Sequence, residues 1–136
     1  MADIKKLGES STGMTPDDIM NRLFNDHSKA HYYHLQTTSY AQHKMLNELY
    51  EALEDSKDAI CEYLLGIQAP KRFGSRTSDT VPAFSDSTLS KFLDDGFKFT
   101  VQLIEYAKSK NLEQLANLAS ELQGVWVKAK YLNTLK

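Results

Sequence analysis

The sequence predicts an all-α protein built as a bundle of four helices. Apolar residues recur at helical spacing in four long stretches, and helix-starting residues precede these stretches. No alternation of apolar and polar residues is long enough to indicate a strand. The length of 136 residues fits one domain, and a hydrophobic content of 41% is enough to form a buried core.

The first helix is expected over about residues 16–35. Thr15 is suited to cap its free backbone N–H groups, and Pro16 is suited to the first helical position. Residues 1–14 are polar and rich in Gly and Ser. We therefore expect a flexible lead over 1–14 and a bundle over 15–136.

The second helix is expected from about Tyr40 to Leu65, after the hydroxyl-rich residues 37–39, and Gly66 is expected to end it. Residues 66–86 contain two Pro and two Gly among many small polar residues, which is typical of a loop. A connection of about 20 residues is long for a compact domain. It predicts a crossover that spans the bundle.

The third helix is expected from residues 85–87 to about Ser109. Gly96 in its middle costs about 1 kcal/mol relative to Ala, which a close approach of another helix would explain. Asn111, with Gln114 three residues later, matches a capping box and is expected to start the fourth helix. The residues of the third helix expected to face inward are Leu89, Phe92, Leu93, Phe97, Val101, Ile104 and Ala107. Two helices, a long connection and two more helices predict an antiparallel bundle with one crossover, the ferritin-like arrangement.

Charge and composition exclude several classes of function. A formal net charge of −2 argues against binding of DNA over the whole surface, and the N-terminal lead offers only Lys5 and Lys6 for this purpose. The single Cys61 rules out a disulfide within the chain and indicates a reducing, cytoplasmic compartment. We expect no signal peptide, and no apolar run approaches the roughly 20 residues that span a membrane. A Gly-rich phosphate loop is missing.

The histidines form the first candidate site. All four lie within 17 residues: His27, His31, His34 and His43. The spacing of the first three puts them on one side of the first helix. Imidazole is the commonest protein ligand of transition metals, so the cluster indicates metal binding.

The second helix adds carboxylates to this set. His43, Asn47, Asp58 and Glu62 fall on related angles of the helix, and the last two form an i, i+4 pair able to hold a cation. A rise of 1.5 Å per residue separates His43 from Asp58 by about 22 Å, so one ion cannot bind both in one chain. They would meet if two copies packed antiparallel about a two-fold axis, with the carboxylates of one facing His31 and His43 of the other. The alternative is that the carboxylates belong to a solvated face.

The stretch from His31 to Gly66 resembles the mini-ferritins, or Dps proteins. In that family a second His follows the first after twelve residues, an Asp follows after fifteen more and a Glu after four more. His31, His43, Asp58 and Glu62 reproduce these spacings. The resemblance implies a dimeric metal site in which two imidazoles and two carboxylates bind Fe(II) and support its oxidation.

A second resemblance covers His31 to Lys44, which is similar to a ferritin-like family carried by tailed bacteriophages. Together the two imply iron sequestration or peroxide protection, with zinc or manganese as other occupants of the site. They imply a homo-oligomer, either a two-fold dimer or a larger cage, in the host cytoplasm or in a virion. His34 and Asn47 would hold a second, weaker ion or a water. Tyr33 or Tyr40 would donate electrons or serve in packing.

Departures from the mini-ferritin pattern leave a second function open. Asn47 stands where that family often has an Asp ligand, and the loop 66–86 replaces a short helix that lies across the dimer. These departures favour a non-catalytic phage structural or host-interaction protein on the same scaffold.

Overall fold

The computed structural model describes residues 13–135, which contain four α-helices and no strand. In chain order these are α1 (Pro16–Gln36), α2 (Tyr40–Gln68), α3 (Asp86–Ser109) and α4 (Glu113–Leu132). The predictions of an all-α protein and of four long helices are confirmed. Residues 1–12 of the predicted lead lie outside the described residues. Across 13–135 every helix is too short or too polar to cross a membrane.

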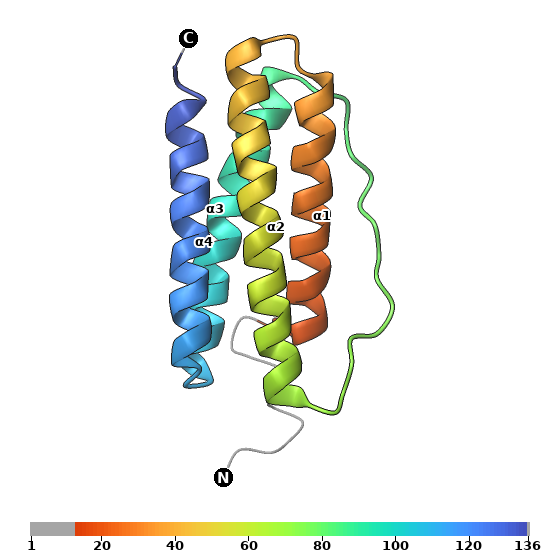
Figure 1. Ribbon diagram of the computed structural model, residues 1–136, viewed down its shortest axis with the longest axis vertical. Helices are drawn as coiled ribbons and strands as arrows, with labels where there is room; N and C mark the ends of the chain where they lie inside the picture. The colour runs from red at the N-terminus through yellow and green to blue at the C-terminus, as the bar shows by residue number, and fades with distance from the viewer. Residues whose placement is uncertain (1–12, 136) are drawn as a thin grey trace.

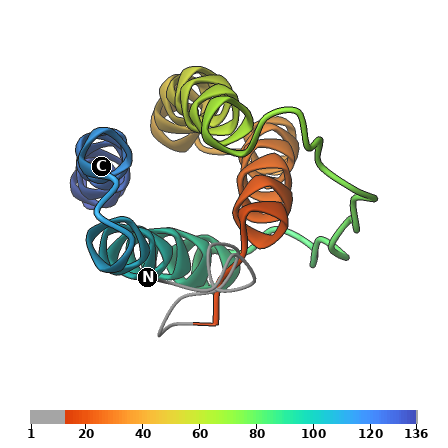
Figure 2. The same cartoon turned by 90° about the horizontal axis from the view of Figure 1, so that it is seen from below.

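The helices form two antiparallel hairpins, α1 with α2 and α3 with α4 (Figure 1). Seen from below, they occupy the corners of a square in the order α1, α2, α4, α3 (Figure 2). The hairpins meet mainly where α2 packs on α4, whereas α1 and α3 touch at few points. Residues 69–85 run along the outside of α1 from one end of the bundle to the other, so α2 and α3 point in the same direction (Figure 1).

Three helices begin where the sequence predicts. The Thr15 hydroxyl accepts a hydrogen bond from the Asp18 N–H, and the Asp18 carboxylate accepts one from the Thr15 N–H. Ser39 caps α2 with one such bond, and Ser85 forms a second reciprocal box with Thr88 at the start of α3. Each cap satisfies backbone donors that the helix itself leaves free.

The predicted end of the second helix is wrong by three residues. Gly66 lies inside α2, which continues to Gln68. A Cβ at Gly66 would meet nothing within 4 Å, so this glycine neither enables a close contact nor turns the chain. Ala69 is no longer helical because Pro70 follows it, and the residue before a proline is driven out of the helical region.

The predicted role of Asn111 is also wrong. This residue has φ of 58°, and it ends α3 instead of starting α4. Its N–H donates to the Lys108 carbonyl at 3.1 Å, and the Leu112 N–H donates to the Ala107 carbonyl at 2.8 Å. That pair of bonds is a Schellman motif, in which Asn replaces the more usual Gly at the left-handed position. α4 then starts at Glu113 after Leu112, with no side-chain capping bond, so Gln114 completes no box.

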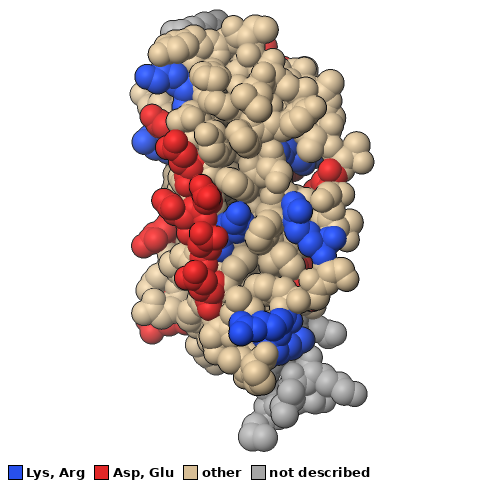
Figure 3. All heavy atoms as spheres, turned by 45° about the vertical axis from the view of Figure 1, so that its right-hand side comes forward, with Lys and Arg blue, Asp and Glu red and all other residues tan. Residues whose placement is uncertain are grey.

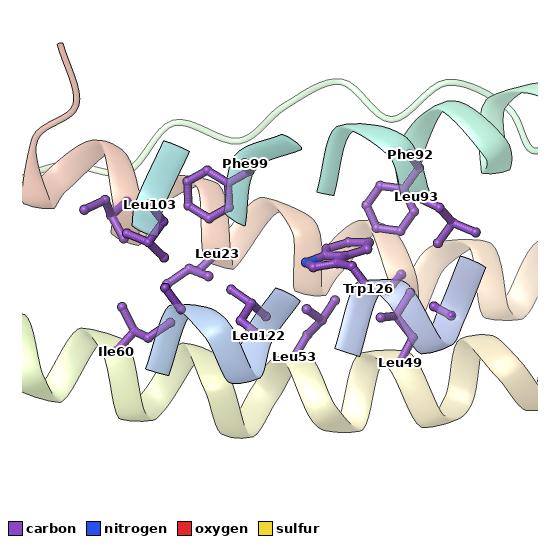
Figure 4. Packing of buried hydrophobic residues seen from close by; sticks show 14 of the residues in the cluster. Leu23, Leu49, Leu53, Ile60, Phe92, Leu93, Phe99, Leu103, Leu122 and Trp126 are labelled. Atoms are coloured by element: carbon purple, nitrogen blue, oxygen red, sulfur yellow. The ribbon is translucent and has the colours of Figure 1, made fainter. Parts of the chain in front are cut away.

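Leucines, isoleucines and aromatic rings from all four helices fill the space between the hairpins (Figure 4). Trp126 is fully buried at its centre, and a Cβ at Gly96 would lie 2.4 Å from its ring. The expected close helix approach at Gly96 is therefore confirmed. The buried face of α3 differs in part from the prediction, since Val101 is 39% exposed while Phe99 and Leu103 are buried.

The connecting segment (residues 69–85) is fastened to α1 by amide side chains one helical turn apart. The Thr77 N–H donates to the Asn21 side chain at 2.8 Å. Asn25 donates to the Thr77 carbonyl at 3.0 Å and accepts from the Asp79 N–H at 3.2 Å. These bonds satisfy backbone groups in a segment that has no regular structure of its own.

Candidate metal centre

His34 and His43 form a stacked pair at the corner between α1 and α2. Their ring centroids lie 3.8 Å apart, with 20° between the planes. His34 Nδ1 is 2.9 Å from the His43 carbonyl oxygen, and His43 Nδ1 is 2.9 Å from the His34 carbonyl oxygen. The two rings therefore close the corner by exchanging bonds with each other's backbone.

These reciprocal bonds decide which ring nitrogen is available to a metal. A carbonyl oxygen only accepts, so the Nδ1 of each ring must carry the hydrogen and donate. A neutral imidazole protonated at Nδ1 has its lone pair on Nε2. Metal-binding histidines are commonly oriented in this way, through a bond from the other nitrogen to a carbonyl. His43 is exposed, whereas His34 is 8% exposed.

The other two histidines, His27 and His31, follow this pair along α1 and contact the same ring of α2. The centroid of the His31 ring lies 4.6 Å from that of the Tyr50 ring on α2, and the centroid of the His27 ring lies 6.1 Å from it. Tyr50 is also 5.4 Å from His34. We call His27, His31, His34 and His43 the histidine row. The predicted side-by-side placement of the three α1 histidines is confirmed, since all three contact one ring.

Tyr50 is the tyrosine that the sequence analysis missed as a neighbour of the site. It follows His43 by seven residues, two helical turns, which is the signal that could have placed it on the same face. Of the two tyrosines that the sequence suggests, Tyr33 lies away from the histidines, whereas Tyr40 lines a surface hollow together with His43. Tyr33 is 1% exposed and packs edge-on against Phe92 in the core, while Tyr40 is 74% exposed.

His27 links the histidine row to the carboxylates of α2. Burial lowers the pKa of His27, and the nearby Lys57 lowers it further, against the opposing effect of Glu54 and Asp58. Its Nε2 is buried and has no hydrogen-bond partner within the described chain. His27 was part of the predicted cluster but was not assigned to the metal site, and its four-residue spacing from His31 is the signal for including it.

Asp58 and Glu62 are exposed and belong to an acidic column that follows α2 (Figure 3). The exposed carboxylates of this helix are Glu48, Glu51, Glu54, Asp55, Asp58 and Glu62. Asn47 is half-buried and donates to Glu51 at 3.3 Å. Asn47 and His43 line the same surface hollow of about 300 Å³.

Within residues 13–135 of one chain, no three His, Cys, Asp or Glu side chains are placed to hold a metal ion together. The structure thus brings His34 to His43 and His31 to Tyr50, but it does not bring Asp58 or Glu62 to His43. This separation agrees with the distance of about 22 Å expected from the helical rise. A site that uses both groups needs two copies of the chain.

Fold and side chains together define a small four-helix protein with a row of histidines and a column of carboxylates on one hairpin. Residues 34–132 match the model of a family of unknown function (DUF5856), so the chain belongs to that family. The match includes His43, Asp58 and Glu62, whereas His27 and His31 precede it. No curated protein and no solved structure matches the chain.

Proposed function

We propose that the protein is a Dps-like iron-binding protein that oxidises Fe(II) at a site shared by two copies of the chain. The observation that carries this proposal is the reciprocal bonding of His34 and His43. It fixes the ring nitrogen that a metal would use on an exposed histidine, next to a helix face rich in carboxylates.

The order and direction of the four helices support the same assignment. The two hairpins are antiparallel, α2 and α3 run in the same direction, and residues 69–85 cover the length of the bundle between them (Figure 1). Ferritin-like bundles have one long connection of this kind.

The chemistry of the side chains suits Fe(II). His31 and His43 would supply neutral nitrogen ligands, and Asp58 and Glu62 of a second copy would supply carboxylate oxygens. Two imidazoles with carboxylate leave positions open for oxygen or peroxide, as in non-haem iron sites. Zinc and manganese accept the same ligands and are the competing occupants. His34, held inside the corner, would position His43.

The outer face of α2 is complementary to itself about its midpoint. A two-fold axis between residues 50 and 51 would place each residue of this face opposite a suitable partner. The facing pairs are His43 with Asp58, Asn47 with Glu54, and Tyr50 with Glu51. Each pair joins a carboxylate to a metal-binding or hydrogen-donating side chain, so the metal site and the dimer contact would form together.

Exposed apolar side chains add contact area at the same corner. Tyr32, Leu35 and Tyr40 are 53%, 69% and 74% exposed, and Ile67 at the far end of α2 is 49% exposed. An antiparallel pairing brings the corner of one copy to the far end of α2 in the other. Ile67 would then meet Leu35 of the second copy and bury both.

Oxidation of iron is the direct test. Purified protein is mixed with Fe(II) and peroxide, and ferric absorbance is followed. We expect rapid oxidation that a His43→Ala, Asp58→Ala double variant loses. The matched control is a Glu105→Ala, Asn117→Ala double variant, which changes exposed residues of α3 and α4. Equal rates in the wild type and the His43→Ala, Asp58→Ala variant would disprove the proposal.

A non-catalytic role in a virion or in host interaction is the second candidate. It is favoured by the pairing of Asn47 with Glu51, because an amide at this position offers no charge to a metal. Metal analysis of the native protein separates the two functions. About one iron, zinc or manganese ion per chain supports the metal site, and none supports the structural role.

A further inference from the structure

A groove lies between α2 and α4, where the two hairpins meet. Two hollows of about 180 and 190 Å³ open along it. A cavity of about 150 Å³ admits a benzene ring, so each hollow has room for one side chain. Both are smaller than the roughly 300 Å³ at which small-molecule pockets begin. The groove therefore suits a partner whose side chains protrude into it.

The two hollows are separated by two helical turns on both helices. One hollow contains Ala52 of α2 and Val125 of α4. The other contains Ala59 and Leu118, which are seven positions away from these residues along α2 and α4. Seven residues advance a helix by about 10 Å and return close to the same side. A third helix in the groove would thus present side chains i and i+7 to the two hollows.

The hollow at Ala52, which we call the apolar hollow, is lined mainly by apolar side chains. Ala52, Val125 and Leu132 are half-buried, so part of their apolar surface is open to solvent. The two charged residues of the lining, Glu48 and Lys128, pair with each other at 3.6 Å. This hollow favours an apolar side chain.

The hollow at Ala59, which we call the acidic hollow, differs in charge. Asp55 of α2 and Glu121 of α4 line it, and its lining contains no basic residue. Both carboxylates are exposed, and neither has a hydrogen bond or ion pair within residues 13–135. Ala59 and Leu118 are half-buried and add apolar surface. A Lys or Arg side chain suits this lining, because its stem packs on apolar atoms while its charged end reaches the carboxylates.

The wider charge of α2 favours the same kind of partner. Glu48 and Asp55 belong to the acidic column of this helix (Figure 3). A row of like charges along one edge of the groove attracts a positively charged partner and repels an acidic one.

We propose that this groove binds an amphipathic, basic helix of a protein partner. The helix places an apolar side chain in the apolar hollow and a Lys or Arg, seven residues away, in the acidic hollow. Ala52 follows His43 by nine residues, or two and a half turns, and so lies on the opposite side of α2 from the proposed dimer contact. The groove needs neither a metal nor a second copy of the chain.

A suitable probe is an Ala-rich helical peptide of about 18 residues that carries Leu and Arg seven residues apart. Titrated into the isotope-labelled full chain, it should produce saturable NMR shifts along the groove, at Ala52, Ala59 and Val125 among others. A peptide with Glu in place of Arg should bind at least about tenfold more weakly, because Glu would face Asp55 and Glu121. A peptide with Ala in place of Leu should also lose about tenfold, because it leaves the apolar hollow unfilled.

Two variants of the chain test the hollows separately. Ala52→Leu fills the apolar hollow, and Asp55→Asn, Glu121→Gln removes the charges of the acidic hollow. Each should weaken binding of the Leu and Arg peptide by about fivefold. The matched control, Asp94→Asn, Glu105→Gln, removes one Asp and one Glu from exposed positions of α3 and should bind like the wild type. Circular dichroism confirms that each variant is folded.

The proposal is overturned if the Glu peptide binds as tightly as the Arg peptide, if both groove variants keep full affinity, or if no saturable shift appears. Shifts that map away from α2 and α4 would also overturn it. Groove signals that move when the protein alone is diluted would assign the groove to a second copy of the chain and refute the proposal.

Discussion

Asp26 is a buried carboxyl group whose ionisation opposes folding. Burial raises its pKa from the ordinary value of 3.8 to about 6, and the attraction and hydrogen bonds of Arg22 only partly offset this. Between these two pH values the folded protein keeps a proton that the unfolded chain has already lost. Stability contributed by the neutral form is therefore present at low pH and is lost as the pH rises through this window.

We accordingly expect Asp26 to lower the free energy of unfolding by on the order of 2–3 kcal/mol between pH 4 and pH 7. Urea unfolding of the wild type and of Asp26→Asn at both pH values measures this change. As the pH is raised, the free energy of unfolding of the wild type should fall by this amount relative to that of Asp26→Asn, which carries no titrating group at this position. Asp94→Asn, at an exposed surface pair, is the control and should keep a constant difference from the wild type. A constant difference for Asp26→Asn would contradict the prediction.

At the level of helices, the contact between α3 and α4 depends on a missing side chain. A Cβ at Gly96 would lie 2.4 Å from Cδ2 of Trp126, and this ring is fully buried with Phe92 at 5.1 Å on one side. Neither helix backbone can retreat without opening the core. We expect Gly96→Ala to destabilise the protein by about 1–2 kcal/mol, since overpacking outweighs the gain of about 1 kcal/mol in helix propensity.

Gly124→Ala is the matched control within the same helix pair. A Cβ at Gly124 would meet nothing within 4 Å, and the residue is exposed on α4. Here the substitution should stabilise the protein by about 0.4–1 kcal/mol. Opposite signs in thermal unfolding support the packing argument, and a shared sign for the two substitutions would refute it.

Helix starts could be predicted from sequence more reliably than helix ends. Thr15, Ser39 and Ser85 act through a backbone N–H three residues away, so a short stretch of sequence contains the whole interaction. The end of a helix depends on which of several nearby helix-breaking residues stops it. Gly66 permits a turn but does not force one, whereas Pro70 forces it. Asn is compatible both with the N-terminal cap of a helix and with the left-handed turn that ends one. The residue type of Asn111 therefore did not distinguish between these two roles.

At the scale of the whole molecule, the exposed face of α2 predicts how two copies of the chain pack against each other. If His43 lies opposite Asp58, then Asn47 lies opposite Glu54 of the other copy. A mixture of the Asn47→Cys and Glu54→Cys variants should therefore give a covalent dimer with a short dimaleimide, detected by mass spectrometry. Burial raises the pKa of the Cys61 thiol to about 11, so the native cysteine should not compete.

The control mixture pairs Glu54→Cys with Asn117→Cys, an exposed position on α4. It should give only background cross-linking. Each variant alone should do the same, because neither position faces itself across the axis. Equal yields from all mixtures, or a native mass equal to one chain, would rule out the two-fold arrangement.

The candidate metal centre could be predicted from sequence only as a set of residues. Helical spacing placed His27, His31 and His34 together and separated His43 from Asp58. The reciprocal bonds between His34 and His43 could not be predicted, because they depend on how the corner between two helices closes. The groove between α2 and α4 was missed for a similar reason, since its two walls are far apart in the chain.

The hairpin arrangement also determines how the chain is expected to reach this fold. Each hairpin joins helices that are neighbours in sequence through a connection of only a few residues, so its contacts are local and form quickly. Docking of α2 on α4 must instead close the long segment between them, and the Asn21 and Asn25 bonds hold that segment along α1. The hairpins should form first, and their association should limit the folding rate.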